Sequence, residues 1–112
     1  MPVMFGFATQ RRQILEAELE RFVQEMPPLG MQRMWVVGDL ARGRVSAVSN
    51  LELVLVQDTD EPWRRRPDFW NMHLRPRVGT QFYVFTNEEL ERMADDDPLL
   101  RQAMNHGEPV HG

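Results

Sequence analysis

A glycine-rich turn near the middle of the chain contains residue types that could bind an anion. Gly38 and Gly43 lie five residues apart after an apolar run, and Arg42 and Arg44 accompany them. A turn of this kind can present backbone N–H groups at the start of a helix, where an anion can bind. By itself the pattern is weak, because most strand–glycine–turn segments bind nothing.

A polar pair follows this turn and could belong to the same site. Asn50 and Glu52 lie two residues apart where an apolar run, 51–56, begins. In a strand their side chains would point to the same face. Ligands of α/β proteins bind at the ends of buried strands, so the pair could line a site. A strand end that is merely solvated explains the pair equally well.

The elements that would position these residues can be predicted from periodicity and caps. The apolar spacing predicts a helix from Thr9 to about Met26, with Thr9 as its N-cap and Pro27 ending it. We expect residues 1–8 to form an apolar N-terminal tail. The apolar face of the helix is Leu15, Leu19, Phe22, Val23 and Met26.

Three apolar runs predict strands, and three further segments predict helices. The expected strands are Met34 to Val37, Leu51 to Val56 and Phe82 to Phe85. The expected helices run from Trp63 to about His73, from a capping box at Thr86 and Glu89, and from Asp97-Pro98 through Met104, with Gly107 as a stop. This order predicts an α/β (α+β) fold, in which helices pack against a small mixed sheet.

Composition restricts the classes of function. A chain of 112 residues, 42% of them hydrophobic and 27% charged, suits one globular domain spanning residues 1–112. A net charge of −4 disfavours direct nucleic-acid binding, and the lack of cysteine excludes disulfides and thiolate chemistry. We see no signal peptide and no apolar run of membrane-spanning length, and we expect a cytoplasmic protein.

The two polar segments together resemble a known family signature. The residues Gly38, Ala41-Arg42-Gly43 and Ser49-Asn50-Leu51-Glu52-Leu53 resemble the motif of the polymerase β-like nucleotidyltransferases, and most of all its minimal nucleotidyltransferase (MNT) branch. That motif reads Gly-Ser, Ala-Arg-Gly, then Ser-Asp-x-Asp-Leu before an apolar strand. The later strand ending at Phe85-Thr86 also fits, and the resemblance covers about Gln10 to Gly107.

The resemblance implies where a nucleotide and magnesium would bind. The phosphates would lie in a cradle formed by Gly38, Asp39, Arg42 and Gly43. Magnesium would be held by the Asp-x-Asp pair and by a third acid on a later strand. In this sequence those three positions are Asn50, Glu52 and Gln81.

The sequence departs from the family pattern at the residues that carry the chemistry. Of the three implied carboxylates only Glu52 remains, and Asn50 and Gln81 cannot balance the charge of a cation. Asp39 replaces the motif serine, and a like-charge contact with phosphate at ~4 Å costs on the order of 4 kcal/mol. Magnesium could still bind weakly if Asp39 swings toward Glu52.

Two functions follow from this resemblance. The first is a pseudoenzyme that acts as an interaction module, such as the antitoxin-type partner of a HEPN protein in a toxin–antitoxin pair. The second is an active magnesium-dependent nucleotidyltransferase that moves a nucleoside monophosphate from ATP to a protein or small-molecule hydroxyl. In either case we expect a homodimer, because small domains often associate to cover apolar surface.

One further segment mixes arginine with aromatic residues. The run from Trp63 to Trp70 could be a patch for nucleic acid or for an acidic partner. We favour a structural interpretation, in which Trp63, Phe69 and Trp70 pack on the sheet while the arginines face solvent, because the chain as a whole is acidic.

Overall fold

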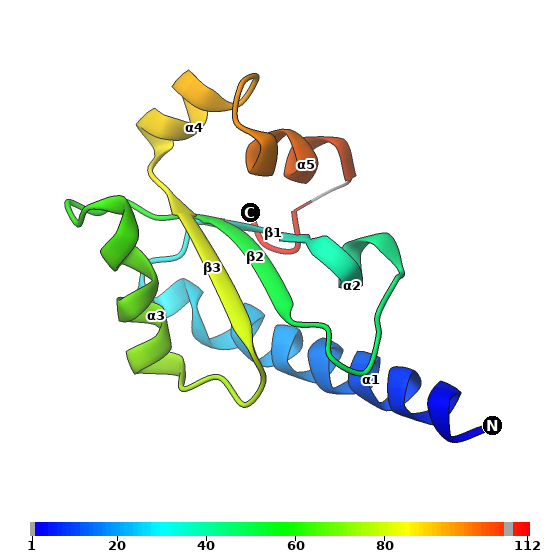
Figure 1. The fold of residues 1–112 in the computed structure, drawn as a ribbon. Helices are drawn as coiled ribbons and strands as arrows, with labels where there is room; N and C mark the ends of the chain where they lie inside the picture. Colours follow the sequence, from blue (N-terminus) through cyan, green and yellow to red (C-terminus); the bar gives the residue numbers. More distant parts are fainter. Residues whose placement is uncertain (1, 107–108) are drawn as a thin grey trace.

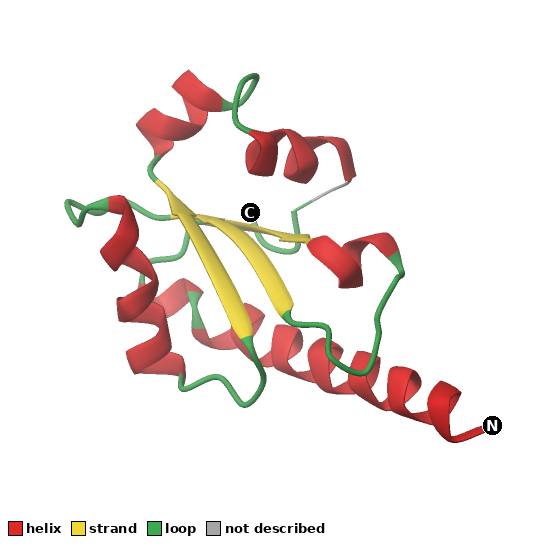
Figure 2. Cartoon of the chain, viewed as in Figure 1, coloured by secondary structure: helices red, strands yellow, loops and turns green. Residues whose placement is uncertain are grey.

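A three-stranded mixed sheet lies between two groups of helices (Figures 1 and 2). The computed structural model describes residues 2–106 and 109–112. The strands are β1 (Arg33–Val37), β2 (Leu51–Val56) and β3 (Thr80–Phe85), in the spatial order β1-β2-β3. β2 is antiparallel to β1 and parallel to β3. The helices are α1 (Pro2–Glu25), α2 (Gly38–Arg42), α3 (Arg66–Leu74), α4 (Asn87–Met93) and α5 (Pro98–His106), with 3-10 turns η1 (Pro27–Leu29) and η2 (Trp63–Arg65).

The central strand is covered on both faces, as its continuous apolar sequence predicted. Leu51, Leu53 and Leu55 on one face join the core under α1 and α3. Val54 and Val56 on the other face pack in a second core with residues of α4 and α5. Alternate residues of a strand point to opposite faces, so the same period places Glu52 on the α4/α5 side.

The first helix is longer than predicted. Residues 2–8 form its first turns rather than a tail, and Thr9 lies inside the helix instead of capping it. Pro2 is at the first position of the helix, where proline is favoured, and residues 3–8 contain no proline that would end it. The predicted apolar face is confirmed: Leu15, Phe22 and Met26 are fully buried, and Leu19 and Val23 pack against the same core.

The predicted strands and the later helices agree with the structure, apart from a few boundaries. β1 and β3 begin one and two residues before the predicted starts, and β2 has the predicted limits. The arginine-rich segment forms η2 before α3 begins at Arg66. Asp97 caps α5 as predicted, through its Oδ1 and the amides of Leu99 and Leu100. That helix continues to His106, and the predicted stop at Gly107 lies outside the described residues.

The structural interpretation of the Trp63–Trp70 run is only partly correct. Trp70 is fully buried, but Trp63 is 45% exposed even though its ring contacts Phe85. Phe69 is also exposed, and Arg66 is buried rather than solvated. The aromatic side chains therefore do not all serve the core.

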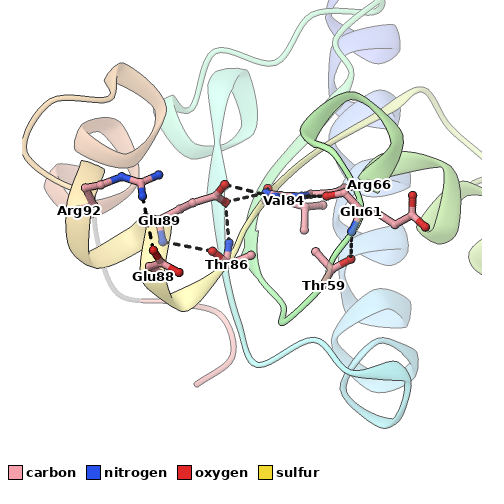
Figure 3. Close-up of polar contacts among 8 residues, drawn as sticks. All are labelled: Thr59, Glu61, Arg66, Val84, Thr86, Glu88, Glu89 and Arg92. Atoms are coloured by element: carbon pink, nitrogen blue, oxygen red, sulfur yellow. Dashed lines mark hydrogen bonds and ion pairs between the residues drawn. The ribbon is translucent and has the colours of Figure 1, made fainter.

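Arg66 is buried because it joins three elements (Figure 3). Its guanidinium donates to both oxygens of Glu89, at 2.6 and 3.2 Å, and to the backbone carbonyl of Val84 at 3.0 Å. Glu89 also completes the predicted capping box with Thr86. One ion pair thus fixes the start of α3 to β3 and α4.

The chain end returns to the outer edge of the sheet. Met34 donates its amide to the carbonyl of His111, and Val110 donates to the carbonyl of Met34. This bridge covers part of the β1 edge, where unpaired backbone groups would otherwise invite other strands. Within the described part of the chain, no helix is both long and apolar enough to cross a membrane.

Candidate functional site

The sheet brings the three positions of the implied carboxylates to one end and one face. Glu52 on β2 and Gln81 on β3 are register partners in the parallel pair. Asn50 precedes Glu52 by two residues, and its side chain lies against Gly79, where a Cβ atom would overlap its Oδ1. Spacing predicted a shared face for Asn50 and Glu52, the resemblance alone added Gln81, and the strand register brings Gln81 beside Glu52.

Glu52 lies between the turn after β1 and a tyrosine on β3. A side chain at Gly38 would collide with the Glu52 carboxylate, and Gly38 has φ +77, a conformation that favours glycine. The Tyr83 hydroxyl donates to Glu52 Oε1 at 3.3 Å. Burial raises the pKa of Tyr83, and the negative charge of Glu52 raises it further. Glu52 therefore lies between two close neighbours near the start of the central strand.

Asp39 is bound within its own loop. Its Oδ2 accepts a hydrogen bond of 2.7 Å from the hydroxyl of Ser49, which is buried. The carbonyl of Ser49 accepts from Arg11 Nε at 2.8 Å, which ties the loop to α1. Asp39 therefore fastens the segment between α2 and β2, a role that the sequence did not indicate.

A side chain of α5 reaches the turn that would form the phosphate cradle. With its amide oxygen facing the turn, Gln102 accepts hydrogen bonds from the Gly38 amide at 3.1 Å and from Arg42 Nη2 at 2.7 Å. This orientation of the amide is the one that satisfies both donors. Gly43, the last of the four cradle positions, ends α2 with φ 70. Two of the polar groups assigned to phosphate thus have a partner from the same chain.

The donor set around Glu52 does not fit a magnesium centre of the family type. The described residues contain no group of three or more histidine or acidic side chains placed to hold a metal ion. Glu52 and Asp39 are the two carboxylates that the resemblance offers to a metal ion, and each already has a hydroxyl partner, Tyr83 and Ser49 respectively.

Two neighbours of the site were absent from the sequence-based prediction. Tyr83 could have been found, because it follows Gln81 by two residues and so shares its face of the strand. Gln102 gave no comparable signal, since it comes from a helix about sixty residues after the turn that it contacts. Only the packing of α5 brings them together.

Comparisons with known proteins give no relative for this chain. No protein family, no curated protein and no solved structure matches it.

Proposed function

We propose that this chain is a nucleotidyltransferase-like domain with feeble or no transferase activity, which acts as an interaction module. By the same resemblance, its partner would be a HEPN protein, and the chain would be the antitoxin-type member of the pair. The observation that carries the proposal is the Gln102 amide bound to Gly38 and Arg42, the groups that the resemblance assigns to phosphate.

The charges near this turn also favour the proposal. A triphosphate at Gly38 and Arg42 would have to displace Gln102 and would then approach Asp39 and Glu52. Bringing a polyanion close to carboxylates is unfavourable unless cations intervene. Hard cations bind oxygen-rich sites best when several carboxylates converge. With Asn50 and Gln81 neutral, we expect such cations to bind poorly.

The direct test is calorimetry of the whole chain with ATP and magnesium, separately and together. We expect no binding at millimolar nucleotide. Tight binding of magnesium and ATP, followed by transfer of a nucleoside monophosphate to a hydroxyl, would refute the proposal and favour the active nucleotidyltransferase.

A second variant tests whether the residues have been aligned correctly with the family. Asn50→Asp with Gln81→Asp restores three acidic side chains near one point, and we expect the variant to bind magnesium more tightly than the original chain. Gln24→Glu with Asn105→Asp is the matched control, because it adds the same charge at exposed positions of α1 and α5. Equal magnesium affinity for both variants would show that the three positions do not form one site.

The partner proposal has its own experiment. In this experiment the product of the neighbouring gene is expressed once by itself and once together with this chain. A small helical HEPN product that co-purifies in a fixed ratio, and whose toxicity this chain relieves, supports the proposal. A neighbouring product of another kind, or one that does not associate, contradicts it.

A further inference from the structure

The outer face of α1 carries apolar side chains that are exposed in the part of the chain that the structure describes. Phe7 is 51% exposed and Ile14 is 43% exposed. They are seven residues apart, which is two helical turns, so they lie on the same face with Gln10 between them. Val48, in the loop beside this part of the helix, is 82% exposed. Single exposed apolar residues need no explanation, but a row of them with hollows between marks an interaction surface.

Two hollows lie along this row. One of about 190 Å³ is lined by Phe7, Gln10, Arg11, Ile14 and Ala47. The other, of about 220 Å³, lies on the far side of Ile14 and is lined by Ala17, Glu18, Arg21 and Arg77. Both are smaller than the ~300–1,000 Å³ of typical small-molecule sites. Their size suits one side chain of a protein partner.

We propose that this face of α1 binds the same face of a second copy, with the two helices antiparallel across a two-fold axis near Gln10. Phe7 of each copy would then fill the hollow beside Ile14 of the other. The face is self-complementary because each copy carries both the projecting ring and the hollow that receives it, as a two-fold contact requires.

Charge and shape favour a second copy as the occupant. In this antiparallel pairing residues 2–10 of one copy, which contain no charged side chain, face residues 11–19 of the other, so like charges do not meet along that stretch. Arg11, next to the proposed axis, is directed to the Ser49 carbonyl of its own chain. The N-terminal half of α1 extends beyond the sheet (Figure 1), so a second copy can reach it without meeting the rest of the body.

The available area sets the strength of this contact. From Pro2 to Ala17 the helix is about 24 Å long at ~1.5 Å per residue. Stable interfaces bury ~1,200–2,000 Å² in total, and a single pair of helices of this length makes a small contact by that standard. We therefore expect a reversible dimer with a micromolar dissociation constant.

Sedimentation velocity of the whole chain, from low micromolar to millimolar concentration, tests the proposal. We expect Phe7→Glu and Ile14→Glu each to weaken the dimer about tenfold or more, because each would bury an unpaired charge. Thr9→Glu is the control, since it adds the same charge at an exposed position on another side of the same helical segment. A chain that is monomeric throughout, or a dimer that tolerates both glutamates, overturns the proposal.

Disulfide cross-linking locates the axis, because the chain has no cysteine of its own. Under mild oxidation Gln10→Cys is expected to give a covalent dimer, whereas Arg12→Cys, on the opposite side of α1, is not. Equal cross-linking of both variants contradicts the antiparallel pairing. Binding to lipid vesicles without dimer formation would assign this face to a membrane surface and would also overturn the proposal.

Discussion

Replacing Glu89 by glutamine should destabilise the fold strongly, even though the two side chains have nearly the same size, because the change removes the charge and one of the two acceptors for Arg66. Arg66 is 8% exposed and loses its ionic partner, since both Glu89 oxygens accept from its guanidinium. Removing one member of a buried pair costs about 3–5 kcal/mol. Because Glu89 is 22% exposed, we expect a loss of stability at the lower end of this range, about 3 kcal/mol.

Urea denaturation measures this change. With a slope of about 1–3 kcal/mol per molar urea, a loss of about 3 kcal/mol lowers the midpoint by roughly 1–3 M. Arg66→Met is the partner variant. The double variant should cost less than the sum of the two single ones, because the second change removes the charge that the first left unpaired.

The pH dependence separates the ion pair from other effects of the substitution. The hydrogen bonds from Arg66 lower the pKa of Glu89, against the opposing effect of burial. The Arg66–Glu89 ion pair therefore contributes its full share of the free energy of unfolding above the unfolded carboxyl pKa of ~4.3. This contribution is lost as the pH falls through the lower pKa that Glu89 has in the folded state. The difference in free energy of unfolding between the original chain and Glu89→Gln should therefore become smaller in acid. A gap that stays constant, or an unchanged midpoint at neutral pH, would refute the reasoning.

Three further changes probe the site and its supports. Gln102→Met should lower stability by about 1 kcal/mol, because it leaves Gly38 N–H and Arg42 without their acceptor. Gln102→Glu should lose less stability, because glutamate keeps an oxygen that can accept both hydrogen bonds. Thermal unfolding compares the two variants. Glu52→Gln should lower the pKa of Tyr83 part of the way to its ordinary value, since the effect of burial remains. Ultraviolet titration reports this directly because Tyr83 is the only tyrosine, and an unchanged curve would contradict the contact. Thr86→Ala should cost about 1 kcal/mol in urea by removing the cap of α4. No loss there would mean that Glu89 alone holds the helix start.

The elements that local chemistry determines could be predicted from the sequence. The run from Leu51 to Val56 is apolar at nearly every position and forms a strand buried on both faces, as expected. The capping box at Thr86 and the cap at Asp97 are local hydrogen-bond patterns, and both are present. The grouping of Glu52 with Gln81 was implied only by the family resemblance, and it is the register between β2 and β3 that brings the two residues together.

Two features escaped prediction for different reasons. Thr9 has the residue type of an N-cap, but the helix continues past it to Pro2, because such a residue does not by itself start a helix. Arg66 looks like a surface residue, and only the meeting of α3, β3 and α4 gives it an ionic partner. For Arg66 the residue type set a local preference that tertiary structure overrode.

Gln102 shows why the same limit applies to the function. The residues from Gly38 to Gly43, read alone, offer unpaired amides and an arginine to an anion. In the folded chain, α5 is fixed by Leu100 and Ala103 in the core, and this places the Gln102 amide on those donors. An anion would have to bind better than an amide that pays no entropy of association. A turn with the spacing of a phosphate cradle can thus instead form a structural contact with another helix. Which of the two roles it has depends on α5, which lies outside the motif.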